Sequence, residues 1–176
     1  MTIKPDTKDW TWVIALRCSE CGFDPAEFRR AEICERILAT VDGWREVLAR
    51  PDVTHRPNAD TWSPLEYACH VRDVNAVMTE RLEMMLQTQP VNFADWDQNS
   101  AEAEAGYNAQ DPETVADQLE AAAKGFAELY RVVGDDDWAR QGMRSNGSPF
   151  TVETLGIYAV HDLEHHRVDV GLPARA

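Results

Sequence analysis

Four segments of this chain place apolar residues three or four positions apart, a spacing that an α-helix with one buried face produces. Three of the segments begin with an aspartate or serine followed by proline, which favours a helix N-terminus. These starts are Asp24-Pro25, Ser63-Pro64 and Asp111-Pro112, and Thr151 opens the fourth segment. We expect helices over about 25–49, 64–87, 112–133 and 152–169.

The four segments together predict an all-α fold. No segment alternates apolar and polar residues in the way that a half-buried strand does. A four-helix bundle buries all four apolar faces against one another. The link between the second and third helices, residues 88–110, is long for a compact domain, so we expect a crossover there. We place the bundle domain at 24–176 and treat residues 1–23 as an N-terminal extension.

Charge and composition argue against several classes of protein. The 176 residues carry 31 acidic and 17 basic side chains, a net charge of −14, whereas nucleic acids and anionic membranes bind clustered Lys and Arg. Twelve acids against two bases lie between Asn92 and Asp137, which we interpret as solvated surface. No apolar run approaches the roughly 18 residues that cross a membrane. We expect a cytoplasmic protein with a small-molecule substrate and no nucleic-acid or membrane partner, with a homodimer as the open alternative to a monomer.

The four cysteines lie at 18, 21, 34 and 69, too few and too irregular for a disulfide framework. Cys18 and Cys21 have the CxxC spacing, which is half of a zinc knuckle or a redox pair. The neighbouring sequence supplies no second half, and Cys34 or His55 would complete one only by folding back. Two ordinary cysteines in an N-terminal extension are an equally good interpretation.

Three histidines lie on predicted helices and border the predicted core. His161 and His165 are four residues apart and project from one face of the last helix, while His70 borders the apolar stripe of the second helix. Neutral imidazoles bind zinc and nickel, and catalytic zinc sites commonly use three protein ligands. A buried imidazole without a partner costs about 1–3 kcal/mol, so we favour one shared metal ion over three separately hydrogen-bonded core histidines.

The same residues resemble the DinB/YfiT-like four-helix bundles. The resemblance rests on TWSPLEYACH at 61–70 and HDLEHH at 161–166, and it extends from the first predicted helix to the last. In that family a histidine of the second helix and an HxxxH pair of the last helix bind zinc or nickel. The resemblance therefore implies His70, His161 and His165 as ligands. Some members use a carboxylate in place of one histidine, and here all three positions match histidine.

The resemblance also implies a class of reaction. Members of the family include S-transferases that use bacillithiol or mycothiol and a mycothiol-dependent maleylpyruvate isomerase. We therefore expect a divalent-metal-dependent enzyme that transfers a low-molecular-weight thiol, held by the metal as a thiolate, to a small electrophile. A metal-dependent hydrolase that activates water is the alternative enzyme. A metal-binding or small-molecule-binding module without catalysis is the alternative outside enzymes.

Residues 161–165 also match the HxxEH pattern, in which the glutamate is the general base of a metallopeptidase. Glu164 points about 100° away from His165 on a helix, which disfavours this hypothesis.

Further candidates surround the expected metal. Asp73 lies three residues after His70 and Asp169 four after His165, so either carboxylate is a candidate partner for a ligating imidazole, although solvated helix charges are the simpler interpretation. Residues 96–98, in the long link, and Arg144 are weaker candidates for the wall over the metal.

Overall fold

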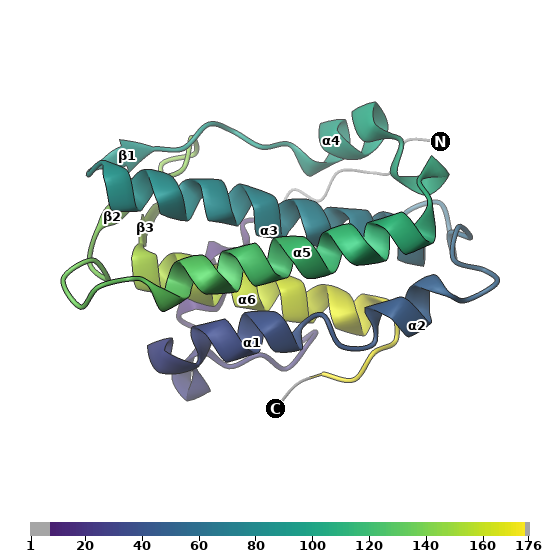
Figure 1. Cartoon of the computed structure of the whole chain (residues 1–176), viewed down its shortest axis with the longest axis horizontal. Helices are drawn as coiled ribbons and strands as arrows, with labels where there is room; N and C mark the ends of the chain where they lie inside the picture. Colours follow the sequence, from purple (N-terminus) through teal and green to yellow (C-terminus); the bar gives the residue numbers. More distant parts are fainter. Residues whose placement is uncertain (1–7, 175–176) are drawn as a thin grey trace.

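Figure 1 shows the computed structural model, which describes residues 8–174. Three long helices lie side by side, and two short helices in line complete the fourth side of a bundle. The bundle helices are α1 (Ile33–Ala39), α2 (Trp44–Leu48), α3 (Pro64–Gln87), α5 (Pro112–Arg131) and α6 (Val152–Asp169). The predicted all-α four-helix bundle is confirmed.

The three long helices begin where their capping residues predict. The Ser63 hydroxyl accepts a hydrogen bond from the Glu66 backbone N–H, and the Glu66 carboxylate accepts one from the Ser63 N–H. Thr151 and Thr154 form the same reciprocal arrangement at the start of α6. Asp111 caps α5 through its side chain. These bonds satisfy N–H groups that a helix N-terminus otherwise leaves without partners.

The segment predicted as one helix over 25–49 is divided in the structure. The single turns η2 (Pro25–Glu27) and η3 (Arg30–Glu32) precede α1 and α2, and Phe28 between the two turns is extended. Gly43, between α1 and α2, has φ +87°, a left-handed conformation that favours glycine. The apolar spacing continues across this break because both short helices bury their apolar side chains, so spacing alone does not reveal the division.

The long link between α3 and α5 crosses along α3 and holds short elements of its own (Figure 1). They are β1 (Val91–Asn92), α4 (Gln98–Ala105) and the turn η4 (Tyr107–Ala109). Strand β1 pairs in parallel with β2 (Gln141–Met143), which pairs antiparallel with β3 (Pro149–Thr151). A Cβ at Gly142 would lie 2.2 Å from Phe93 Cζ, so glycine lets the Phe93 ring lie against the sheet. These strands have two or three residues each, too few to show alternation in the sequence.

Residues 8–23, the described part of the predicted N-terminal extension, pack along α6. The 3-10 turn η1 (Trp10–Ile14) contacts α6, and Val13, Cys18 and Phe23 are buried. Residues 1–7 of the predicted extension lie outside the described residues. The segment therefore contributes to the hydrophobic core and covers one side of the last helix.

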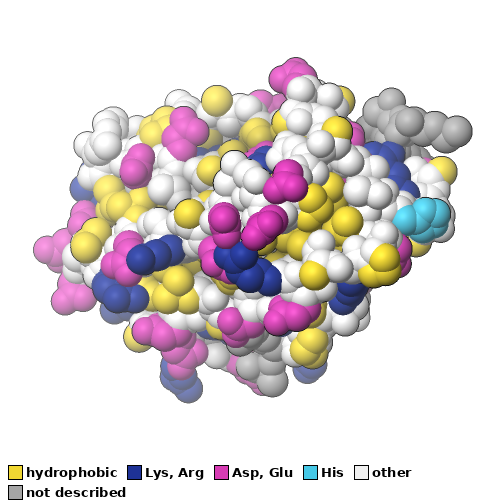
Figure 2. Space-filling view, turned by 45° about the vertical axis from the view of Figure 1, so that its right-hand side comes forward, with side chains coloured by type: hydrophobic (Ala, Val, Ile, Leu, Met, Phe, Trp, Pro, Cys, Tyr) yellow, Lys and Arg dark blue, Asp and Glu magenta, His cyan; other side chains and the backbone are white. Residues whose placement is uncertain are grey.

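The surface carries its acidic side chains among scattered basic ones, as Figure 2 shows for one face. Arg45, for example, pairs with Asp117 and Glu120 of α5. No helix in residues 8–174 is long and apolar enough to cross a membrane.

Candidate metal centres

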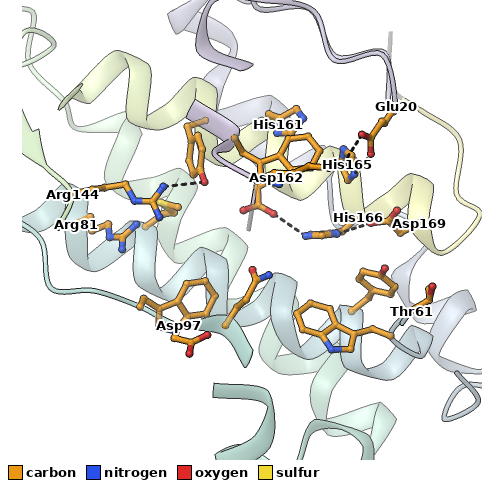
Figure 3. A pocket seen from close by; sticks show the side chains of 18 of the residues that line it. Glu20, Thr61, Arg81, Asp97, Arg144, His161, Asp162, His165, His166 and Asp169 are labelled. Atoms are coloured by element: carbon orange, nitrogen blue, oxygen red, sulfur yellow. Dashed lines mark hydrogen bonds and ion pairs between the residues drawn. The ribbon is translucent and has the colours of Figure 1, made fainter. Parts of the chain in front are cut away.

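Helix α6 contributes four side chains, in two pairs, to groups that could hold a metal ion. Residues four apart share one face of a helix, and one residue further along turns that face by about 100°. His161 and His165 form one pair, and Asp162 and His166 form the other, one residue later. Figure 3 shows the four side chains projecting from α6 in different directions. Each pair joins a different group of potential ligands.

The first group consists of His70 from α3 with Asp162 and His166 from α6. One ligand atom from each of the three side chains lies within 4.8 Å of the other two. Nε2 of His166 is 2.9 Å from Oδ1 of Asp162, and Nε2 of His70 is 3.7 Å from the same oxygen. We call these three residues the His-Asp-His group.

His70 fits a metal ligand because its ring is buried and its contact with Oδ1 of Asp162, at 3.7 Å, is too long for a hydrogen bond. The residue is 1% exposed, and neither ring nitrogen has a hydrogen-bond partner within the described part of the chain. Trp62 and Trp96 enclose the ring, with centroids 5.0 and 5.6 Å away. Burial lowers the pKa of His70, which keeps the imidazole neutral, as ligation requires. A buried polar atom left unpaired costs about 1–3 kcal/mol, which a bound cation would offset.

His166 holds positive charge at the same place. Burial alone would lower its pKa, but hydrogen bonds to Asp162 and Asp169 raise the pKa to about 9. Nδ1 of His166 lies 2.7 Å from Oδ2 of Asp169, so Asp169 orients this ring (Figure 3). Burial would raise the pKa of Asp162, yet His166 and His70 hold it well below its usual value. The two carboxylates therefore favour positive charge at this position.

The second group consists of Cys18 and Cys21 with His161 and His165. One ligand atom from each of the four side chains lies within 4.8 Å of the other three. Sγ of Cys18 is 3.8 Å from Nδ1 of His165. Burial lowers the pKa of His161 to about 4 and also lowers that of His165, so both imidazoles are neutral near pH 7. We call these four residues the Cys-His group.

The structure does not gather His70, His161 and His165, the ligands predicted from the sequence, into one group. His161 and His165 share a face as expected, but that face meets the N-terminal segment, while the face one residue further on meets His70. Asp162 and His166 are the residues that sequence reasoning missed. The signal was present, because HDLEHH contains two pairs of potential ligands four residues apart.

The structure also places Asp169 and Asp73, the two carboxylates considered as partners of ligating imidazoles. Asp169 contacts His166, one residue beyond the expected His165. Asp73 pairs with Arg72 and accepts a hydrogen bond from the Tyr107 hydroxyl, so it forms no hydrogen bond to His70 among the described residues.

A pocket of about 690 Å³ lies against both groups (Figure 3). Trp62, Tyr67 and Trp96 contribute aromatic walls, and Arg81 and Arg144 contribute positive charge. The wall candidates from the sequence, residues 96–98 and Arg144, do line this pocket. Acidic side chains and histidines make up much of the remaining lining, so the pocket combines aromatic walls with many polar and charged groups, a composition that suits a small polar molecule.

A model of the DinB superfamily matches residues 33–168. The chain belongs to the DinB superfamily. YfiT from Bacillus subtilis, described as a probable metal-dependent hydrolase with an unusual four-helix bundle topology, superposes with a TM-score of 0.68 at 17% identity, covering 82% of this chain and 88% of YfiT. A mycothiol-dependent maleylpyruvate isomerase superposes with a TM-score of 0.65 at 12% identity, covering 85% of this chain and 63% of the isomerase. The search of curated proteins found no significant match.

In this DinB bundle, the position of Glu164 argues against the metallopeptidase hypothesis, in which this residue would be the general base. Its carboxylate is 3% exposed and forms a bidentate pair with Arg36, with N–O distances of 2.7 and 2.8 Å from one guanidinium nitrogen. It is therefore engaged between α1 and α6 instead of facing the pocket.

The remaining cysteines of the DinB bundle also serve packing. Cys69 donates to the Tyr107 carbonyl, and burial raises its thiol pKa to about 12. Cys34 donates to the Ala127 carbonyl, and neither Cys34 nor His55 belongs to the Cys-His group.

Proposed function

We propose that this protein is a divalent-metal-dependent enzyme whose ion is held by His70, Asp162 and His166. The observation that carries the proposal is the buried His70 ring, whose nitrogens form no hydrogen bond with residues 8–174, beside two side chains of α6 at the wall of the pocket. Three protein ligands leave coordination positions for another molecule. Two imidazoles and one carboxylate suit zinc, nickel or iron(II), and we propose zinc or nickel.

The pocket supports chemistry with a nucleophile that comes from outside the chain. None of the described residues that line it is a cysteine or a serine. A divalent ion in the His-Asp-His group lowers the pKa of a coordinated thiol or water. We propose a low-molecular-weight thiol as the cosubstrate, supported by the fold shared with the mycothiol-dependent isomerase. Water is the alternative, supported by the likeness to YfiT.

Two of the three basic side chains that line the pocket, Arg81 and Arg144, favour a small electrophile that bears a carboxylate. Arg81 is 7% exposed, lies 5.4 Å from the Phe93 ring centroid and pairs with no carboxylate within the described residues. Arg144 lies beside it and reaches the Tyr158 hydroxyl at 3.5 Å (Figure 3). A guanidinium binds a carboxylate through two parallel hydrogen bonds. These two arginines would position such a substrate close to Asp162 and His166.

Metal analysis tests the ligand assignment. We expect elemental analysis to find one equivalent of zinc or nickel fewer in His70→Ala than in the wild type, because the ion loses its α3 ligand. His55→Ala is the matched control, since His55 is an exposed histidine outside both groups. Equal metal content in His70→Ala and His55→Ala would contradict the proposed site.

A thiol titration separates the two proposed cosubstrates. The cobalt(II)-substituted Cys18→Ser/Cys21→Ser protein carries no cysteine in either group, so any thiolate-to-cobalt absorption must come from an added thiol. We expect mycothiol or bacillithiol to produce this absorption in proportion to occupancy. A protein that shows no such absorption but hydrolyses small carboxylate esters or amides would be the hydrolase instead.

A further inference from the structure

We infer that Cys18, Cys21, His161 and His165 form a second metal site, which holds one zinc ion in a closed tetrahedral shell and fastens the N-terminal segment to α6. This inference is independent of the proposed function, because it uses none of the residues of the His-Asp-His group.

The geometry of the Cys-His group fits zinc. A tetrahedral zinc ion with Zn–S of about 2.3 Å and Zn–N of about 2.0–2.1 Å holds its sulfur and nitrogen ligands about 3.6 Å apart. The Sγ of Cys18 and the Nδ1 of His165 are 3.8 Å apart, and all four ligand atoms lie within 4.8 Å of one another. Both cysteines are free thiols. Two thiolates and one Zn²⁺ are electrically neutral, which suits a buried place.

The loop that carries the cysteines is shaped to present both sulfurs. The Gly22 N–H donates to the Cys18 carbonyl at 2.9 Å, and the Cys18 N–H donates to the Phe23 carbonyl at 2.8 Å. Gly22 has φ +83°, a conformation that other residues adopt only with strain. The chain therefore turns sharply after Cys18, and this turn brings both sulfurs to the face of α6 that carries His161 and His165.

The surroundings indicate that a ligand belongs in the Cys-His group. Cys18 is fully buried and Cys21 is 7% exposed. His161 is 3% exposed, and its Nε2 is a buried nitrogen with no hydrogen-bond partner among residues 8–174. The Trp10 ring covers both histidines, with centroids 5.6 and 5.1 Å away. An unpaired nitrogen next to two thiols in an enclosed space is what a zinc ion would satisfy.

A carboxylate also orients one of the ligands. Oε2 of Glu20 lies 3.8 Å from Nε2 of His165 (Figure 3). Nδ1 of the same ring lies 3.8 Å from Sγ of Cys18. Ligating histidines usually give their second nitrogen to such a carboxylate. Four protein ligands leave no position for substrate, which is typical of structural zinc. A CxxC redox pair instead needs an accessible sulfur, and both sulfurs here are buried.

Zinc at this site would support the wall of the pocket. Lys8, Trp10 and Glu20 line the pocket and belong to the segment that the two cysteines anchor. Removing the ion should therefore loosen this wall while leaving the side chains of the His-Asp-His group on α3 and α6.

A cobalt titration of the full-length protein tests the inference. In a His70→Ala background, which disables the His-Asp-His group, we expect one equivalent of cobalt(II) to bind with thiolate-to-cobalt charge-transfer absorption, and zinc to displace it. Adding Cys18→Ser should abolish the absorption. Adding Cys34→Ser, the matched control, should leave it unchanged, because Cys34 lies outside the group. Absent charge-transfer absorption in the His70→Ala protein would overturn the inference.

A second measurement covers the case in which Cys18→Ser fails to fold. Zinc-edge X-ray absorption on the zinc-loaded His70→Ala protein should give two sulfur and two nitrogen neighbours, with Zn–S of about 2.3 Å. A shell of nitrogen and oxygen alone, or a Cys18–Cys21 disulfide in protein purified under reducing conditions, would refute the site.

Discussion

Arg81 buries a guanidinium beside the candidate active site, and the described residues supply no carboxylate to pair with it. Burial, together with the charge of Arg144, lowers the pKa of Arg81. Burying an unpaired charge is costly, so the position of this side chain is better explained by a ligand than by stability.

We therefore expect Arg81→Met to keep or raise the unfolding temperature while weakening the binding of small carboxylates by about ten- to hundredfold, the effect of losing a charged hydrogen bond. Thermal-shift titrations with short mono- and dicarboxylates would measure both quantities. Arg45→Met, which removes an exposed arginine paired to Asp117 and Glu120, is the control and should leave carboxylate binding unchanged. Unaltered binding in Arg81→Met would exclude this residue as the anion-binding group.

The positions of some individual site residues could be predicted from the sequence. Helical spacing correctly placed His161 and His165 on one face of a helix and His70 near the core. Which face of α6 meets α3 and which meets residues 8–23 is a matter of tertiary packing, and periodicity carries no information about it. For the same reason the spacing of Cys18 and Cys21 was recognisable, whereas their neighbours on α6 were not.

Among the elements, α6 packs closely against the other helices at Gly156. A Cβ there would lie 2.8 Å from Ile33 Cδ1 and 2.9 Å from the Tyr130 hydroxyl. Both neighbours are buried, and the Tyr130 hydroxyl donates to the Val152 carbonyl at 2.9 Å. The glycine therefore permits the close approach of α1, α5 and α6.

Gly156→Ala should destabilise the protein by about 1–2 kcal/mol, because overpacking outweighs the gain of about 1 kcal/mol in helix propensity. Gly125→Ala in α5 is the matched control, since a Cβ there meets nothing within 4 Å. It should stabilise by about 0.5–1 kcal/mol. Urea unfolding would compare the two variants, and a stabilised Gly156→Ala would show that the helices can separate without cost.

The start of α3 supplies a pH-dependent contribution to stability. Burial alone would raise the pKa of Glu66, but hydrogen bonds from Arg56 and Ser63 lower it below its ordinary value of 4.5. Because the folded pKa lies below the unfolded one, this stabilisation is complete above pH 4.5 and is lost as pH falls through the folded pKa.

We expect Glu66→Gln to cost about 1–3 kcal/mol at pH 7, the value of a buried charged hydrogen bond. The gap between the unfolding free energies of the variant and the wild type should narrow as pH falls below 4.5. Denaturant unfolding of both proteins at a series of pH values measures this difference in unfolding free energy. A gap of constant size would mean that the carboxylate charge is unimportant to the cap.

Capping chemistry made α3, α5 and α6 predictable from the sequence, since each cap is a local arrangement of a few residues. The division between α1 and α2 and the small sheet were not predictable. The first depends on the left-handed conformation of Gly43, and the second on contacts between segments about fifty residues apart.

For the whole molecule, the dominant feature is a net charge of −14. Like charges on a compact surface repel one another and weaken the folded state. Raising ionic strength from about 0.01 to 0.1 M shortens the screening length from about 30 to about 10 Å.

We therefore expect the unfolding free energy to rise by about 1 kcal/mol over that range of salt, the scale of modest surface electrostatics. Urea unfolding in sodium chloride would show the rise. A fall with salt would mean that surface pairs such as Arg45 with Glu120 outweigh the repulsion.

The two ligand pairs of α6 are offset by one residue, so the rotation of this helix about its axis, which we call its phase, determines which side chains face His70. If α6 turned by about 100°, His161 and His165 would take the places of Asp162 and His166 opposite His70, and a three-histidine centre would replace the mixed one. Val160 and Glu164 would then face the two cysteines. By favouring one phase, the N-terminal cysteines would help to decide whether the proposed ion beside the pocket meets a carboxylate or imidazoles alone.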